Sequence, residues 1–213
     1  MSRGRLITIE GIDGAGKSTL AAGLRDALTD RGVDIKLLRE PGGVPASERI
    51  REVVIDPDLH VTARTEALLY AAARAQLVEE AVEPVLNTGT WLLLDRFIDS
   101  SLAYQGGGRE LGIEAVRSIN DFAIRTAHPD RTLLLMIDPE RGRGRSSSRA
   151  RAPDRLEREQ DAFFDRTNAA YLELHSQDPH RIRRIDASLP PDQVLAAALG
   201  ELADLLPDPE VPA

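Results

Sequence analysis

The 213-residue sequence predicts an α/β protein with a five-stranded parallel sheet and helices on both faces. Short apolar runs alternate with long segments of helical pattern, and this alternation is typical of strands joined by crossover helices. The first run leads at once into a glycine-rich segment that ends in Lys17-Ser18, where a helical pattern begins. The length suffices for one domain with a sizeable core, and two full domains are not expected.

Five apolar runs are the expected strands, and six helical segments surround them. The strands are expected at residues 6–9, 33–38, 91–94, 133–137 and 182–185. The helices are expected at residues 17–31, 47–54, 62–87, 113–127, 156–175 and 191–205. One domain would then cover residues 1–206 with a small lid at about residues 141–155, and a flexible tail would follow at residues 207–213.

The segment from Gly11 to Ser18 fits the phosphate-binding pattern G-x-x-x-x-G-K-[ST], and it stands between an expected strand and an expected helix. Glycines let backbone N–H groups converge on phosphate oxygens, and the helix N-terminus adds positive potential. Lys17 would neutralise the β- and γ-phosphates, and the Ser18 hydroxyl would reach Mg²⁺. The sequence therefore predicts a phosphate-loop NTPase fold. The residues expected at the bound triphosphate are Gly11, Ile12, Asp13, Gly14, Ala15, Gly16, Lys17, Ser18 and Thr19.

Composition argues against several classes of protein. A formal charge of −8 and a pI near 5.1 argue against general nucleic-acid binding, which depends on surplus Lys and Arg. The absence of cysteine excludes a disulfide framework and a thiolate zinc site. The apolar run at residues 133–137 is too short to span a bilayer, and the first five residues lack a signal-peptide core. We therefore expect a soluble cytoplasmic protein without a nucleic-acid or membrane partner.

A carboxylate and a guanidinium follow the third expected strand. Residues 91–94 are apolar, and Asp95-Arg96 come directly after them. Asp95 is placed as a Walker B carboxylate would be, so Ser18 and Asp95 are the expected Mg²⁺ ligands. Arg96 is expected to contact the transferred or the acceptor phosphate, which makes Lys17 and Arg96 candidate catalytic residues. A purely structural ion pair is the simpler alternative for Asp95 and Arg96.

The phosphate-binding pattern alone does not name the reaction. A GTPase would need an N-K-x-D segment after a strand, which this sequence lacks, and a motor would need a longer chain. A small kinase needs a phosphate loop, an acceptor pocket and a closing cationic lid, and all three have candidates here. A catalytically silent nucleotide-binding module or switch remains as an alternative from a different class.

The candidate lid lies in segment 141–158, which holds seven Arg and two acidic residues among glycines and serines. We expect a mobile basic loop between two helices; a solvated linker without a catalytic role has the same composition. The phosphate loop has no cation at residues 13–15, so the charge that develops on the transferred phosphoryl group needs another partner. A lid Arg would supply it. The candidates are Arg149, Arg151 and Arg155.

Four short motifs, which occur in a fixed order along the chain, indicate the family of the protein more closely than the phosphate-binding pattern alone. They read E-G-I-D-G-A-G-K-S-T at 10–19, R-E-P-G-G at 39–43, D-R-F-I-D-S-S-L-A-Y-Q-G at 95–106 and D-R-L-E at 154–157. Together they resemble the motifs of thymidylate kinases, of the bacterial type with an Arg-rich lid. The resemblance implies transfer of the γ-phosphoryl group of MgATP to dTMP, giving dTDP and ADP for dTTP synthesis, and a homodimer formed through helices that flank the sheet. A kinase for another nucleoside monophosphate is the nearest alternative.

The resemblance also implies which residues form the dTMP pocket. Segment 39–43 and Arg51 would border the monophosphate. Tyr70 and Arg74 are four residues apart and so share a helix face, where Tyr70 would stack on thymine and Arg74 would hydrogen-bond the base. An ordinary surface contact between Tyr70 and Arg74 is the alternative. The full expected set is Asp13, Arg39, Pro41, Arg51, Tyr70, Arg74, Arg96, Ser101, Tyr104 and Gln105.

The segment after Arg96 would complete this pocket. Tyr104 would lie against the sugar and Gln105 would contact the base. Two positions depart from the family's usual residues, because Tyr70 replaces a Phe and Phe97 replaces a Tyr. Any role of the hydroxyl at position 97 is therefore lost in this chain.

Overall fold

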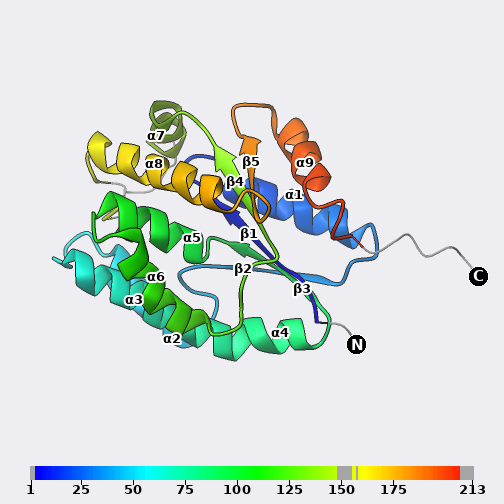
Figure 1. Cartoon of the computed structure of the whole chain (residues 1–213), viewed down its shortest axis with the longest axis horizontal. Helices are drawn as coiled ribbons and strands as arrows, with labels where there is room; N and C mark the ends of the chain where they lie inside the picture. The colour runs from blue at the N-terminus through cyan, green and yellow to red at the C-terminus, as the bar shows by residue number, and fades with distance from the viewer. Residues whose placement is uncertain (1–2, 148–154, 157, 207–213) are drawn as a thin grey trace, which may run out of the picture.

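The computed structural model describes residues 3–147, 155–156 and 158–206, so the predicted tail at 207–213 and the lid candidates Arg149 and Arg151 lie outside the described residues. Five parallel strands form one sheet in the order β2-β3-β1-β4-β5 (Figure 1). They are β1 (Leu6–Glu10), β2 (Ile35–Arg39), β3 (Trp91–Asp95), β4 (Arg131–Met136) and β5 (Ile182–Asp186). This confirms the predicted α/β phosphate-loop fold and all five strands, whose ends differ by two residues or fewer.

Helices surround this sheet, and two of them include π-helical turns, η1 and η2. The elements are α1 (Lys17–Thr29), α2 (Pro45–Ile55), α3 (Ala63–Leu77), η1 (Val78–Val82), α4 (Glu83–Asn87), α5 (Ile98–Ser101), η2 (Leu102–Gly108), α6 (Ile113–Ile124), α7 (Pro139–Ser147), α8 (Asp161–Gln177) and α9 (Pro191–Gly200). The helix predicted at 62–87 is the continuous series α3, η1 and α4. None of the described helices is long and apolar enough to cross a membrane.

Two expectations about the region of the lid are wrong. The helix predicted from residue 156 begins only at Asp161, because Gln160 before it is extended. The loop predicted from residue 141 is helical as far as the end of α7. Glycine and serine disfavour an isolated helix, but Asp138 accepts hydrogen bonds from the first N–H groups of α7 and Gly142 packs on the phosphate loop. The Asp138 cap and the packing of Gly142 thus outweigh the low helix propensity of the glycines and serines in α7.

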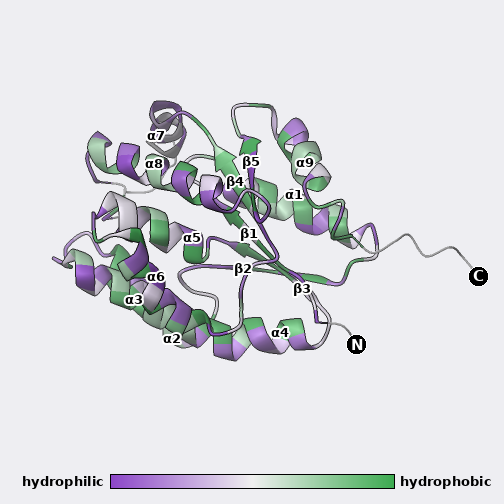
Figure 2. Cartoon of the chain, viewed as in Figure 1, coloured by the Kyte–Doolittle hydropathy of each residue, from purple (hydrophilic) through white to green (hydrophobic). Residues whose placement is uncertain are grey.

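The strands bury both faces of the sheet, since alternate side chains belong to two apolar clusters. Ile7 and Leu93 pack with α1 and α9 on one face. Leu92 and Leu94 pack with η1, α4, α6 and α8 on the other. Figure 2 shows the strands as predominantly hydrophobic, which explains why the apolar runs were visible in the sequence.

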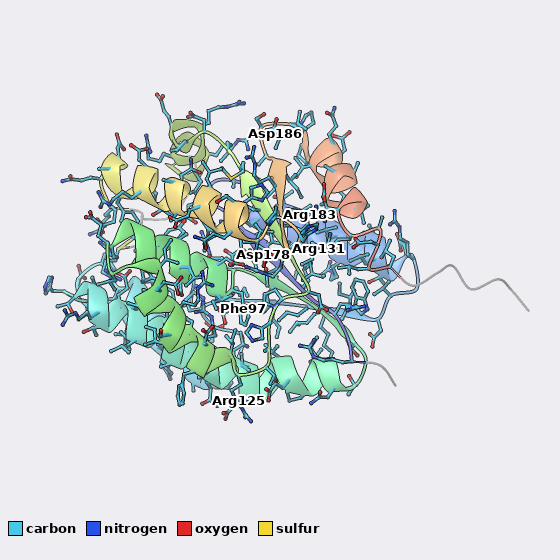
Figure 3. All side chains as sticks on the ribbon, in the orientation of Figure 1. Phe97, Arg125, Arg131, Asp178, Arg183 and Asp186 are labelled. Carbon is cyan, nitrogen blue, oxygen red and sulfur yellow. The ribbon has the colours of Figure 1, made fainter. Side chains whose placement is uncertain are left out.

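Charged residues on β4 and β5 tie the chain after α9 to the sheet. Arg131 donates to the Glu201 carbonyl at 2.6 Å and to Asp204 at 2.7 Å, and Arg183 lies 3.5 Å from the Glu201 carboxylate (Figure 3). Acceptors therefore compensate the burial of Nη1 and Nη2 of Arg131, whereas its Nε is buried without a hydrogen-bond partner among the described residues.

The carboxyl ends of β1, β2 and β3 meet at one edge of the sheet. Asp95 pairs in register with Ile9 on one side and with Arg39 on the other. The phosphate loop, segment 39–43 and Arg96 follow these three strands, so they are brought together. Ligands of open α/β sheets bind at this edge.

Candidate active site at the carboxyl ends of β1, β2 and β3

Glycines shape the phosphate loop between β1 and α1. Gly14 and Gly16 have φ angles of 80° and 94°, a left-handed backbone that side chains disfavour. Gly142 of α7 lies directly against Gly14, and a Cβ on Gly14 would overlap the Gly142 carbonyl. No described side chain caps the N-terminus of α1, which leaves its backbone N–H groups available to an anion. This geometry can hold a phosphate group.

Lys17 begins α1, and its side chain folds back over the phosphate loop. Its Nζ donates to the carbonyl oxygens of Gly11 at 3.1 Å and Ile12 at 3.0 Å, and it lies 3.8 Å from Asp13. Burial and the neighbouring Arg96 lower the pKa of Lys17 to about 8. A bound phosphate chain would add negative charge beside Nζ and favour its protonated form.

Ser18 and Asp95 form the hydroxyl–carboxylate pair that the sequence predicts as a Mg²⁺ site. Ser18 Oγ donates to Asp95 Oδ2 at 2.8 Å. Both are hard oxygen ligands, and Mg²⁺ in nucleotide sites usually combines one or two such groups with phosphate oxygens and water. The described part of the chain has no cluster of three or more His, Cys, Asp or Glu that could hold a metal. The donor set therefore fits a Mg²⁺ ion that is shared with a nucleotide.

Arg96 occupies an unusual backbone position at the end of β3. Its φ of 72° is rare for a residue with a side chain, and such outliers cluster at functional sites. The guanidinium donates to the Gly11 carbonyl at 3.0 Å and to Ser100 Oγ at 3.1 Å, and it pairs with Asp13 at 2.6 Å. It also lies 5.1 Å from the ring centroid of Tyr104. These contacts hold the cation beside the phosphate loop.

Arg39 and Arg51 meet at the loop that follows β2. Nη1 of each donates to the carbonyl oxygen of Pro41, at 3.0 Å and 3.1 Å respectively. Arg39 also pairs with Glu48 at 2.9 Å, and the Gly43 N–H together with Arg39 holds the pKa of Glu48 below its usual value. The guanidinium groups of Arg39 and Arg51 thus lie together on this side of the site, where both could donate hydrogen bonds to a phosphate.

One cleft collects most of the predicted site residues. It is lined by Asp13, Gly14, Gly16, Lys17, Ser18, Arg39, Pro41, Arg51, Tyr70, Arg74, Asp95, Arg96, Ser101, Tyr104 and Gln105. Four predicted phosphate-loop residues, Gly11, Ile12, Ala15 and Thr19, do not line it. Residues that the sequence did not single out, Glu40, Ile55, Ser100 and Leu156, also line it.

Arg74 lines the cleft from α3, but its guanidinium is buried and all five of its N–H donors are engaged. Nε and Nη2 donate to Glu40 Oε2 at 2.9 Å and 2.6 Å. The remaining donors serve Ser101 Oγ at 2.9 Å, the Phe97 carbonyl at 3.0 Å and Asn120 Oδ1. A hydrogen bond from Arg74 to a base stays a prediction, and it would require Arg74 to release one of these acceptors.

Glu40, the partner of Arg74, lies in segment 39–43, which was predicted to border the monophosphate, but no role was predicted for this residue itself because its contacts are distant in the chain. It precedes a cis peptide bond to Pro41, and burial raises its pKa. Its second oxygen, Oε1, is buried without a hydrogen-bond partner among the described residues. Oε1 of Glu40 is therefore a buried acceptor without a donor, on a residue that lines the cleft.

Tyr104 and Gln105 enter the cleft from η2. The Tyr104 ring packs edge-on against Phe163 and Tyr171, with centroids 6.0 Å and 6.3 Å away, so Tyr104 belongs to the core as well as to the cleft. Gln105 Nε2 donates to Glu66 on α3 at 2.8 Å. The roles of Tyr104 at a sugar and Gln105 at a base stay predictions.

Arg155, the described lid candidate, lies at α2 and α3. Its Nε donates to the Val54 carbonyl at 3.0 Å, and Nη2 pairs with Glu66 at 2.5 Å. Its predicted catalytic contact therefore requires a rearrangement of this segment.

Glu10 is a further residue that sequence reasoning missed. It ends β1, fully buried, and accepts from the Phe97 N–H at 2.8 Å, from Ser100 Oγ at 2.5 Å and from the Tyr171 hydroxyl at 3.0 Å. Burial and the nearby carboxylate of Asp99 raise the pKa of Glu10 to about 7. A carboxylate that ends an apolar run just before the phosphate loop, as Asp95 ends the third run, is the signal that could have found it.

The fold and this site define the class: the chain is a phosphate-loop nucleotide kinase, with a phosphate loop and the guanidinium groups of Arg39, Arg51 and Arg96 in one cleft. Within that class it belongs to the thymidylate kinase family, because the family profile described as thymidylate kinase matches residues 9–198. The chain is 44% identical over 204 residues to a thymidylate kinase of Alkalilimnicola ehrlichii, covering 95% of this chain and 94% of that protein. It is 48% identical over 186 residues to a thymidylate kinase of Chromobacterium violaceum, covering 87% of each chain.

The pKa of Glu10 makes stability depend on pH. Between pH 4.5, where an ordinary Glu ionises, and pH 7 the folded state binds the extra proton, so the free energy of unfolding falls as pH rises. We expect a decrease of about 1–3 kcal/mol across this window, which Glu10→Gln removes. Denaturant unfolding at pH 5 and 7.5 measures it, with exposed Glu114→Gln as the control. Equal pH slopes in wild type and Glu10→Gln would contradict this origin.

Proposed function

We propose that this chain transfers the γ-phosphoryl group of MgATP to dTMP, giving dTDP and ADP for dTTP synthesis. The observation that carries the proposal is the convergence of Lys17 and Arg96 with Arg39 and Arg51 on one cleft, in a member of the thymidylate kinase family. The substrates ATP and dTMP and a cytoplasmic location belong to the same proposal.

Phosphoryl transfer to a monophosphate needs no general base in this site. The second pKa of a phosphate monoester is about 6, so the acceptor is mostly ionised at neutral pH. The chain must therefore align the two phosphates and neutralise the charge that develops between them. Lys17 and Arg96 supply cations at the transferred group, while Arg39 and Arg51 orient the acceptor. Mg²⁺, held by Ser18 and Asp95 with the nucleotide, would neutralise phosphate charge.

The remaining residues of the cleft would recognise the nucleoside. Tyr70 supplies a ring on which a pyrimidine can stack. Tyr104, which lines the cleft, would exclude a 2′-hydroxyl, and Ser101, Gln105 and Arg74 line the cleft with polar groups. Asp13 pairs with Arg96 and is placed to orient it.

The proposed substrate is tested by ADP release across a panel of monophosphates. We expect kcat/KM to be highest for dTMP, lower for dUMP, which lacks a methyl group worth roughly 1–3 kcal/mol in a fitted pocket, and lowest for dCMP. Lys17→Ala should lower kcat for dTMP by about 100-fold or more while circular dichroism stays unchanged. The chain's second lysine, exposed Lys36, provides the matched control Lys36→Ala. A higher kcat/KM for another monophosphate favours the alternative kinase, and no turnover with any favours a silent nucleotide-binding module.

The Arg-rich lid is proposed to act at the transition state. Replacing Arg149, Arg151 and Arg155 together by Gln should lower kcat about 100-fold, with KM for both substrates within roughly three-fold of wild type. Single-turnover and steady-state kinetics measure this split. The control replaces three exposed arginines on other elements, Arg25, Arg49 and Arg184. An unchanged kcat with raised KM would make the segment a steering patch.

We also propose a homodimer through α2, α3 and α6, which lie side by side (Figure 1). Phe122 on α6 is 87% exposed and Leu68 on α3 is 56% exposed. A second copy of the chain packed on this face would remove these large apolar side chains from water. Analytical ultracentrifugation should give twice the chain mass of 23.3 kDa. Phe122→Asp should shift the protein toward the monomer, whereas Leu172→Asp on α8 should not. A wild-type monomer at micromolar concentration would refute this arrangement.

A further inference from the structure

Glu66 on α3 is a fully buried carboxylate that the proposed phosphoryl transfer does not use. Three side chains from other segments donate to it. Arg109 Nη2 does so at 3.0 Å, Arg155 Nη2 at 2.5 Å and Gln105 Nε2 at 2.8 Å. Arg109 is itself held by Glu159, with Nη1 2.5 Å from the carboxylate. Hydrogen bonds and ion pairs therefore link Glu66 to Gln105, Arg109 and Arg155, and through Arg109 to Glu159.

This environment fixes the orientation of the Gln105 carboxamide. Oε1 of Glu66 accepts hydrogen bonds from Gln105 Nε2 at 2.8 Å and from Arg109 Nε at 3.3 Å, and a carboxylate oxygen accepts from an amide N–H but not from an amide oxygen. Gln105 must therefore present its NH₂ group to Glu66, and its Oε1 is directed the other way. The side chain of Gln105 is 2% exposed and lines the cleft, and no described residue donates to its Oε1.

Gln105 thus offers Oε1 as a fixed acceptor, and it lines the same cleft as Tyr70 and Arg74. All five donors of Arg74 already have partners within the protein. The N3 position of thymine and uracil is an N–H donor, whereas N3 of cytosine is an acceptor. A fixed acceptor therefore favours thymine and uracil, which donate from N3. With cytosine, the lone pairs of Gln105 Oε1 and of the base N3 would face each other without a proton between them.

We propose that Glu66 is a positioning residue for base selection, which acts by locking the Gln105 carboxamide with its oxygen toward the base. This inference deepens the proposed function and rests on it. A merely structural role of Glu66, as a link between α3, η2 and Arg155, would change stability and leave the choice between bases unaltered.

The test uses Glu66→Gln in the full chain. The amide at position 66 can donate to Gln105 Oε1, so the Gln105 carboxamide can turn over and offer its NH₂ to N3 of cytosine. We expect the ratio of kcat/KM for dTMP to that for dCMP to fall about 10-fold, mainly through KM, because the site then accepts either pattern. The ratio of dTMP to dUMP should stay unchanged, because both bases carry N3–H. Glu159→Gln, which removes the other partner of Arg109 without touching Gln105, should leave both ratios as in wild type.

Two further variants keep the inference falsifiable if Glu66→Gln folds poorly. Glu66→Asp keeps the charge but withdraws it from Gln105, and it should lower the dTMP-to-dCMP ratio in the same direction. Gln105→Met removes the carboxamide and should abolish the preference that depends on it. An unchanged dTMP-to-dCMP ratio in folded Glu66→Gln or in Gln105→Met overturns the inference, as does an equal fall in Glu159→Gln. A wild type that does not phosphorylate dTMP refutes the proposed function instead.

Discussion

The guanidinium of Arg74 is the point to which four parts of the site are tied. It joins α3 to Glu40 after β2, to the Phe97 carbonyl and Ser101 near α5, and to Asn120 on α6. Burying an ion pair costs several kcal/mol in lost hydration, and here a full set of acceptors compensates that cost for the arginine. Replacing either Arg74 or Glu40 by a neutral residue would leave the other as an uncompensated buried charge, which would lower the free energy of unfolding by about 3–5 kcal/mol. The shape of the cleft therefore depends on this pair.

The cleft also has a charge opposite to that of the whole chain. The protein carries a formal charge of −8, yet Lys17, Arg39, Arg51 and Arg96 line one cavity. Low-dielectric walls strengthen their field inside the cleft, while dispersed surface carboxylates are screened by salt. Anionic nucleotides can thus be drawn to a site on an acidic protein, and net charge alone says little about such a ligand.

Sequence reasoning correctly located the strands and residues whose positions depend on local order. The strands followed from apolar runs, and the phosphate loop, Asp95 and Arg96 followed from their places at strand ends. It failed where the role depends on distant contacts. Glu40 and Glu66 meet partners more than 30 residues away, and α7 forms against local propensity because Gly142 packs on the phosphate loop. The partners of Arg74 could not be read from its spacing to Tyr70.

The contact between Gly14 and Gly142 restricts how this enzyme could evolve. A side chain at position 14 would meet both a left-handed backbone and the carbonyl of Gly142. An arginine or lysine could not be introduced there by one substitution unless α7 moved away. Moving the proposed lid cation into this part of the loop would need coupled changes at positions 14 and 142, which are more than a hundred residues apart. A protein with its cation in the lid and one with its cation in the phosphate loop are thus separated by an intermediate that packs badly. Selection would therefore tend to keep a lineage in one of these two arrangements.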